Sequence, residues 1–181
     1  MQCDDLIFGL VAIYAVPQSK SKSWWQYPWN VPYSPDVASI TPAQLGHSSA
    51  ASLIEDLKKD GVLLTNQPDN GDGGAKVVIY CDEKMSLQCK HKRVAAGIQW
   101  TNTVKATAIQ PYTELASTFA SFVTEPHDLF CVGDNGLIFC VRSVEEAYEG
   151  SVTKKASENG WTQEVQFQLL NCHAAQELQT L

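Results

Sequence analysis

Residues 128–142, DLFCVGDNGLIFCVR, carry the strongest structural signal in this chain, and they predict a β-hairpin. Asn135-Gly136 is the pair that a two-residue type I′ turn prefers, and an apolar run flanks it on each side. With these two residues as the loop, Cys131 lies opposite Cys140 in a non-hydrogen-bonded pair, whose Cα atoms are about 4.5 Å apart. A disulfide accepts this separation. The stretch therefore predicts a hairpin with a Cys131–Cys140 disulfide.

The same register gives the hairpin an apolar face. Side chains alternate between the two faces of a strand, so the residues opposite to the cysteines share one side. They are Phe130, Val132, Phe139 and Val141. We expect this face to pack into the core of the protein.

The composition indicates one globular domain that spans residues 1–181. The chain has 181 residues, a formal charge of −7, 18% charged residues and 44% hydrophobic residues. This length is enough to bury a sizeable core. The acidic balance argues against nucleic acid as a partner, because neutralising phosphates requires clustered Lys and Arg.

The cysteines favour an oxidising compartment. There are six of them, an even number, and no pair has the C-x-x-C spacing. After Cys131–Cys140, we expect Cys81–Cys89, because a turn near residues 83–85 would return the second strand beside the first. Cys3–Cys172 follows by elimination. The sequence therefore predicts a secreted, disulfide-stabilised protein.

Near the start of the chain, residues 6–16 (LIFGLVAIYAV) predict a strand that is buried on both faces, although a buried helix has a similar pattern. Eleven apolar residues are too few to span a bilayer. Asp4 and Asp5 stand where a signal peptide would be positively charged. We expect no membrane span.

Residues 18–40 form an irregular segment rich in aromatic residues and proline. Thr41-Pro42-Ala43-Gln44 then combines an N-cap, a proline at the first helical position and a capping-box glutamine, so a helix should begin there and end at Gly61. Gly46 can split this helix in two.

Further strands are expected at residues 61–64, 76–82, 88–104 and 161–169. The third is the expected partner of the second and has a possible bulge near Gly97. The fourth alternates clearly between apolar and polar residues.

Two more helices are expected, at residues 112–124 and 143–160, and residues 173–181 form a polar tail. Gly150 weakens the second of these helices. About three helices and a largely antiparallel sheet make this an expected α+β fold.

The aromatic segment is the first candidate binding site. Its rings suit sugars, cationic groups or a protein groove, and prolines restrict its backbone. The alternative is a loop that covers the domain and buries these rings. The rings belong to Trp24, Trp25, Tyr27, Trp29 and Tyr33.

A weaker candidate, for anion binding, is the dense basic cluster of Lys90, His91, Lys92 and Arg93. On a strand, Lys90 and Lys92 share one face, and His91 and Arg93 share the other. The cluster could bind phosphate or sulfate, or place His91 as an acid or base. The alternative is a solvated edge strand whose charges prevent pairing with other strands.

Metal and cofactor sites are not expected. Cys81, Cys89 and His91 lack the short spacings of zinc sites, and residues 69–73 match a calcium loop only in composition. Cys172 and His173 would point to opposite faces of a strand, so they do not form a catalytic pair.

None of the common catalytic motifs occurs in the sequence. The sequence therefore favours a secreted recognition protein, similar to an effector or toxin, with a protein or glycan partner. Two alternatives stay open: a small secreted hydrolase that uses His91 or another histidine with a carboxylate, and a carbohydrate-binding module that uses the aromatic segment.

Overall fold

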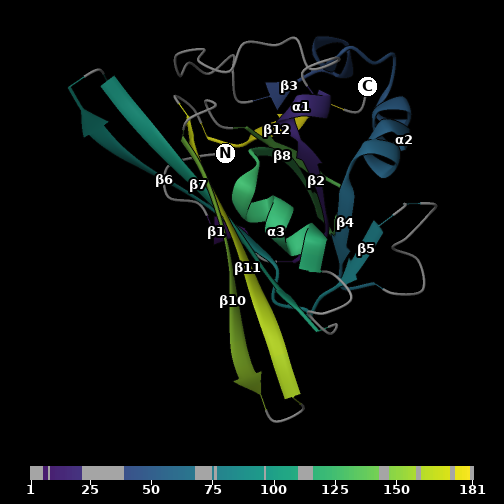
Figure 1. Cartoon of the computed structure of the whole chain (residues 1–181). Helices are drawn as coiled ribbons and strands as arrows, with labels where there is room; N and C mark the ends of the chain where they lie inside the picture. The colour runs from purple at the N-terminus through teal and green to yellow at the C-terminus, as the bar shows by residue number, and fades with distance from the viewer. Residues whose placement is uncertain are drawn as a thin grey trace.

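The computed structural model describes residues 6–7, 9–21, 39–67, 75, 77–95, 97–109, 116–142, 147–157, 160–171 and 174–179. These residues form two β-sheets with helices packed against them (Figure 1). Twelve strands and three α-helices are present in this part of the chain.

Sheet A has five antiparallel strands in the order β1-β6-β7-β11-β10. Two hairpins, β6–β7 and β10–β11, make up most of it, and Figure 1 shows their turns at opposite ends of the sheet. The strand bounds are β1 Leu6–Ile7, β6 Ser86–Val94, β7 Gly97–Ala108, β10 Tyr148–Ser157 and β11 Gly160–Asn171.

Sheet B has seven strands in the order β3-β12-β9-β8-β2-β4-β5. Two neighbouring pairs, β3 with β12 and β4 with β5, are parallel, and the other pairs are antiparallel. The bounds are β2 Leu10–Pro17, β3 Ser39–Ile40, β4 Val62–Thr65, β5 Val77–Tyr80, β8 His127–Gly133, β9 Ile138–Val141 and β12 Gln176–Leu178.

Helices pack against both faces of sheet B. Side chains of α3 join the first core, which lies between the two sheets, whereas those of α2 and η2 join a second core on the other face of sheet B. Among the described residues, sheet B is thus covered on both faces and sheet A on one. The helix bounds are α1 Gln18–Ser21, the 3₁₀ helix η2 Pro42–Leu45, α2 Ala50–Asp60 and α3 Ala116–Thr124.

The N-terminal segment runs from sheet A into sheet B. Gly9 has a φ of 80° and separates β1, in sheet A, from β2, in sheet B. In β2, Ile13 and Ala15 face the first core, and Tyr14 and Val16 face the second. The predicted strand buried on both faces is confirmed, with a break at Gly9.

The hairpin at residues 128–142 forms as β8 and β9, but its register differs from the prediction by one residue. Gly133 N–H donates to the Leu137 carbonyl (2.8 Å), and Gly136 N–H donates to the Gly133 carbonyl (3.0 Å). Gly136 has a φ of 84°. These features define a three-residue loop, which needs one left-handed residue where a type I′ turn needs two. Cys131 consequently pairs with Phe139, not with Cys140.

This shift overturns the Cys131–Cys140 disulfide. A one-residue change of register moves one cysteine to the opposite face, so Cys131 lies in the first core and Cys140 in the second. Cys81–Cys89 is also wrong: Cys81 follows β5 of sheet B, Cys89 lies on β6 of sheet A, and no disulfide joins them. No disulfide stabilises the described part of the fold.

The α+β class is wrong as well, because β-sheet dominates the described residues. Residues 148–157, expected in a helix, form β10. Tyr148 and Val152 are four residues apart, a spacing that places them on one face of a helix and equally on one face of a strand. A Cβ at Gly150 would lie 2.0 Å from the Phe122 carbonyl oxygen, so α3 approaches β10 at the glycine that weakened the helix prediction.

Residues 88–104 were wrongly expected to be one strand paired with residues 76–82. Gly97 begins a second strand, not a bulge, and the two halves pair with each other as β6 and β7. The supposed partner, β5, joins sheet B. Part of the predicted polar tail forms strand β12, in which Gln176 and Leu178 are buried.

Other predicted elements are confirmed. Thr41 forms the predicted capping box, Gly46 ends η2, and Gly61 follows α2. The strand expected at residues 161–169 is β11, with Val165, Phe167 and Leu169 buried. Helix α3 covers the second half of the helix expected at residues 112–124. No helix in the described part of the chain has the length and apolar character needed to cross a membrane.

Candidate binding surface

The outer face of sheet A, which points away from the first core, is the candidate site. On β6 and β7 this face carries only polar side chains at its central positions, because alternate residues such as Leu87, Cys89 and Val104 point into the core. The outward side chains are Ser86, Gln88, Lys90 and Lys92 on β6, and Gln99, Thr101, Thr103 and Lys105 on β7.

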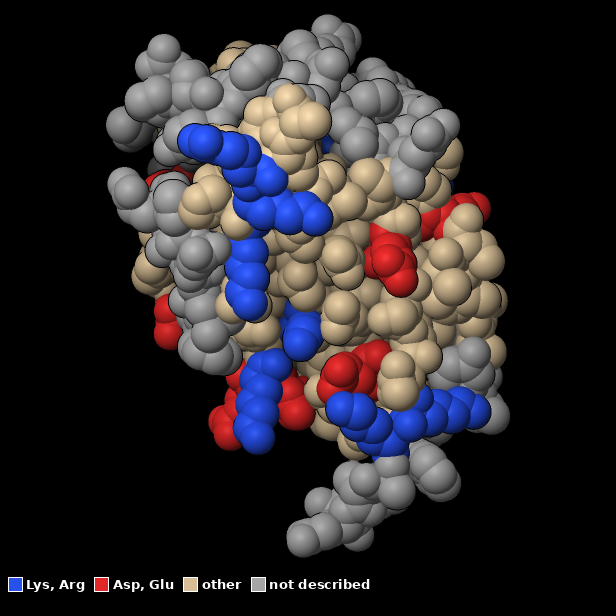
Figure 2. Space-filling model, turned by 90° about the vertical axis from the view of Figure 1, so that its left-hand side faces the viewer, with Lys and Arg blue, Asp and Glu red and all other residues tan. Residues whose placement is uncertain are grey.

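Three exposed lysines form a row on this face, which we call the basic row: Lys92, Lys90 and Lys105. Lys90 and Lys92 are alternate residues of β6, so they lie about 7 Å apart. Lys105 pairs with Ser86 and extends the row along the sheet. Figure 2, which views this side of the molecule, shows Lys and Arg side chains in a line down the face.

The charge of the β6–β7 hairpin is opposite to that of the chain. Residues 86–108 contain four Lys or Arg and no Asp or Glu, a formal charge of +4. The total is −7, so the rest of the chain carries −11. No ion pair joins a lysine of the basic row to a described carboxylate. The row is therefore a local positive field on an acidic protein.

The strand register divides the predicted basic cluster between two faces. Lys90 and Lys92 point outward, whereas His91 stacks on Trp100 of β7, with ring centroids 5.0 Å apart. Arg93 is exposed near the turn, on the same face as His91. Among the described residues, β1 pairs with Leu87 and Gln88 of β6, and no described strand pairs with the β6 edge beyond Gln88.

Lys105 was missed by sequence reasoning. The prediction treated residues 88–104 as one strand, and so did not place this lysine beside Lys90 and Lys92. Two strands that meet near Gly97 would have put Lys105 across from Ser86. The informative signal was the absence of acidic residues from both strands.

The aromatic segment cannot be placed. Trp24, Trp25, Tyr27, Trp29 and Tyr33 lie outside the described residues, and their role in binding stays a prediction. The same holds for the Cys3–Cys172 disulfide and for His173.

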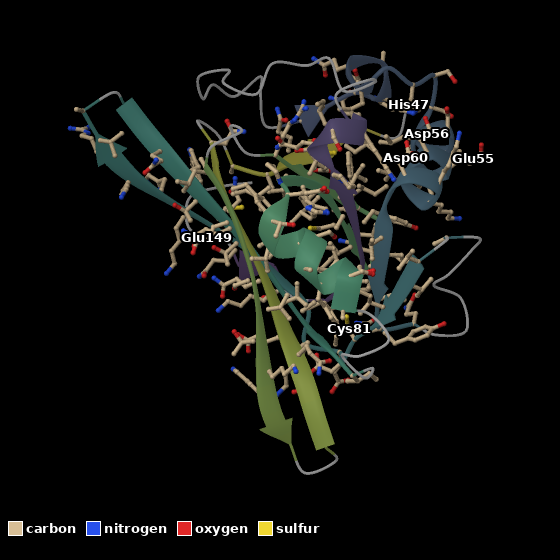
Figure 3. All side chains as sticks on the ribbon, in the orientation of Figure 1. His47, Glu55, Asp56, Asp60, Cys81 and Glu149 are labelled. Atoms are coloured by element: carbon tan, nitrogen blue, oxygen red, sulfur yellow. The ribbon has the colours of Figure 1, made fainter. Side chains whose placement is uncertain are left out.

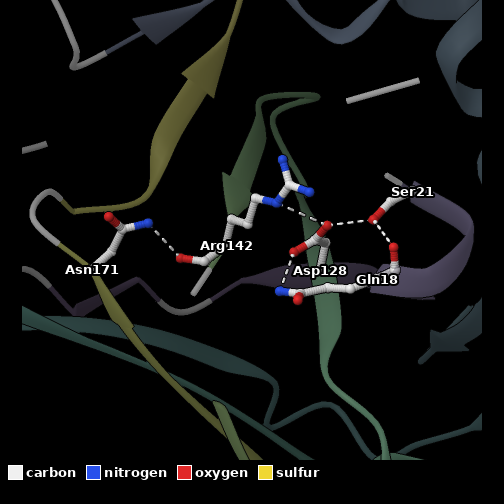
Figure 4. A network of polar contacts seen from close by, with 5 residues as sticks. All are labelled: Gln18, Ser21, Asp128, Arg142 and Asn171. Atoms are coloured by element: carbon white, nitrogen blue, oxygen red, sulfur yellow. Dashed lines mark hydrogen bonds and ion pairs between the residues drawn. The ribbon is translucent and has the colours of Figure 1, made fainter. Parts of the chain in front are cut away.

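A buried carboxylate organises the end of sheet B next to α1. Asp128 accepts hydrogen bonds from Gln18 Nε2 (3.1 Å) and Ser21 Oγ (2.5 Å), and its Oδ2 is 3.2 Å from Arg142 Nε (Figure 4). The Arg142 carbonyl accepts from Asn171 Nδ2 (2.8 Å). Burial lowers the pKa of Arg142 to about 10, and Asp128 opposes that effect. The Arg142 guanidinium is therefore charged at neutral pH, and these contacts connect α1, β8, β11 and the residue that follows β9.

His127 lies in a buried aromatic cluster of Phe119, Phe122, His127, Tyr148 and Phe167. Its Nδ1 is 2.8 Å from the Glu125 carbonyl oxygen, which fixes the proton on Nδ1. Burial lowers its pKa, so the imidazole is neutral, and its Nε2 has no partner among the described residues. The hydroxyl of Tyr148 in this cluster donates to the Phe122 carbonyl oxygen (2.6 Å), so its proton is already engaged.

One described histidine does contact a carboxylate. His47 Nε2 is 2.6 Å from Asp56 Oδ2, and its Nδ1 is 2.8 Å from the Leu45 carbonyl oxygen. Both ring nitrogens are engaged, so neither is left to activate a nucleophile. Figure 3 shows His47 near Asp56 of α2, across the molecule from Glu149 on sheet A. His47 therefore connects η2 to α2.

Three of the four described thiols are poor nucleophiles. Burial raises the pKa of Cys81 to about 12, and it raises the pKa values of Cys131 and Cys140 as well. The described residues contain no cluster of three or more His, Cys, Asp or Glu side chains that could bind a metal ion.

Comparison of the chain with protein families, with curated proteins and with solved structures finds no match.

Proposed function

We propose that this protein is a recognition protein and that the basic row on the outer face of sheet A binds an anionic macromolecule. The observation that carries the proposal is the concentration of positive charge: the β6–β7 hairpin has four basic residues and no acidic one in a chain of charge −7.

The surroundings of the row support binding. The three lysines are exposed, and the described part of the chain places no helix or strand over this face. A positive row along a sheet attracts an extended anion, and releasing the counterions of that anion favours the complex. Lys is a strongly hydrated point charge, which makes such binding sensitive to salt.

The proposal changes the predicted site. Lys90 and Lys92 stay in it, Lys105 is added, and His91 and Arg93 are left out because they point to the other face. The protein partner, the hydrolase alternative and the role of the aromatic segment stay predictions. Secretion also stays a prediction, and two of the disulfides on which it depended are absent.

Charge reversal on the full chain tests the proposal. Fluorescence anisotropy would measure the binding of labelled heparin and of labelled single-stranded poly(dT) to wild type, to K90E/K92E and to K154E/K155E. The last variant changes the net charge equally, but it lies on β10 of the same sheet. We expect wild type to bind at least one probe and K90E/K92E to bind about tenfold or more weakly.

The matched control should stay within about twofold of wild type, since salt screens charges that do not contact the ligand. Melting temperatures would establish that each variant is folded. Failure of wild type to bind either probe at low salt, or equal losses in the two variants, would contradict the proposal.

A further inference from the structure

We infer that the partner is an acidic polysaccharide, a sugar chain bearing sulfate or carboxylate groups, which lies along β6 and β7 over the basic row. This inference rests on the proposed function and specifies its partner. Three features of the surface carry it: the length of the row, the lack of aromatic rings beside it, and the uncharged side chains between its lysines.

The row is too long for one small anion. Lys92 pairs with Gln99 and Lys105 pairs with Ser86, so the ends of the row are six positions apart along β6. At the rise of a β-strand this is about 20 Å. A single phosphate or sulfate would reach one lysine or two neighbours. An extended polyanion reaches all three.

The outer face offers no ring for stacking. Its described side chains on β6, β7, β10 and β11 include no Trp, Tyr, Phe or His, because Trp100, Phe167 and Tyr148 all point toward the core. Proteins that bind single-stranded nucleic acids stack bases on aromatic side chains. The absence of rings therefore disfavours single-stranded nucleic acid.

The side chains between the lysines suit a chain of hydroxyl groups. Gln88 and Thr103 face each other across β6 and β7, and Thr101 is opposite Lys90. All three are partly exposed, and none of their side chains hydrogen-bonds to another described residue. Amide and hydroxyl groups both donate and accept, so they complement sugar hydroxyls, while the lysines bind the acidic groups.

A direct comparison of polymers tests the class of partner. Anisotropy of labelled heparin, with wild-type protein, would be competed by unlabelled heparin, polygalacturonate, poly(dT), neutral dextran and inorganic sulfate. We expect the two acidic polysaccharides to compete at least about tenfold better than poly(dT), and dextran and sulfate not to compete.

The outcomes of this competition distinguish the polysaccharide partner from the proposed function on which it rests. Equal or stronger competition by poly(dT) would overturn the polysaccharide partner while leaving the basic row as a polyanion site. Competition by sulfate alone at low concentration would overturn the extended ligand. No binding of any polyanion would overturn both.

A second variant, Q88A/T103A, tests the sugar contacts without changing charge. If hydroxyl groups of the polymer bind between the lysines, this variant should bind heparin about three- to tenfold more weakly, with an unchanged slope of log Kd against log salt. Its affinity for poly(dT) should not change. The matched control S151A removes a hydroxyl from the outer face of β10 and should bind both polymers as wild type does. Unchanged heparin affinity in Q88A/T103A would overturn the inference.

Discussion

The two long hairpins of sheet A have similar lengths and the same antiparallel pairing, yet the chain uses them differently. In the β10–β11 hairpin, Tyr148 and Phe167 join the aromatic cluster, and Lys155 pairs with Glu164 at 2.7 Å. Its residues 148–171 carry a formal charge of −1. The β6–β7 hairpin carries +4 and ends in an exposed turn. Both hairpins pack one face against the first core, and they differ in the outer face, which carries the basic row on β6–β7.

The largest expected effect on stability comes from removing a fully buried side chain of the β10–β11 hairpin. Phe167 is fully buried and contacts Phe122, with ring centroids 5.1 Å apart. Phe167→Ala should lower the free energy of unfolding by about 3–5 kcal/mol. Ile98 of β7 is 48% exposed, and Ile98→Ala should change it by less than about 0.5 kcal/mol. Urea unfolding would measure the free energy of unfolding of each variant. Similar losses of stability in the two variants would contradict this expectation.

The contact between α3 and β10 should give a smaller effect. A Cβ on Gly150 would lie 2.0 Å from the Phe122 carbonyl oxygen and 2.7 Å from the Tyr148 hydroxyl. Gly150→Ala should therefore cost about 1–3 kcal/mol, because the backbone of α3 has to move. Ser151→Ala, on the outer face of the same strand, is the control. A Gly150→Ala variant as stable as this control would mean that α3 does not pack at this distance.

His127 gives the aromatic cluster a dependence on pH. Burial lowers its pKa below the usual value near 6.5, so the unfolded chain binds the proton more readily. The stabilising effect is complete above about pH 6.5, and it is lost as the pH falls toward the lowered pKa. Urea titrations between about pH 7.5 and 5 should show a steeper loss for wild type than for His127→Phe. Parallel curves would exclude His127 as the source.

The smallest effect concerns the exposed charges. Replacing Lys155 with Met removes the ion pair with Glu164 and should cost about 0.2–1 kcal/mol at low salt. High salt should abolish this cost. Lys90→Met removes no such pair, so it should leave stability unchanged or slightly increased. Thermal melts at two salt concentrations would compare the variants, and a larger cost at Lys90 would indicate that the basic row stabilises the fold.

Much of the fold was predictable where one local signal dominates. The capping box at Thr41, the break at Gly46 and the alternation in β11 depend on neighbouring residues and were correct. The hairpin register was not predictable in the same way. Asn135-Gly136 fits a two-residue and a three-residue loop, and Asp134 N–H donates to the carbonyl of Gly9, a contact more than a hundred residues away in sequence.

The α+β prediction was wrong because a local pattern was again compatible with two structures. The spacing of Tyr148 and Val152 fits a helix and a strand, and the approach of α3 to Gly150 becomes visible only in three dimensions.

Two of the three lysines of the candidate site were predicted from the sequence. Lys90 and Lys92 were expected on one face of a strand, whereas Lys105 required the pairing of β6 with β7.

Lysine footprinting on the full chain tests the central claim most directly. Acetylation of each lysine would be followed by mass spectrometry with and without heparin. We predict that heparin protects Lys90, Lys92 and Lys105 and leaves Lys58, Lys59, Lys154 and Lys155 as reactive as before. Protection of α2 or β10 lysines in place of the basic row would contradict the account, and so would no protection under conditions where heparin binds.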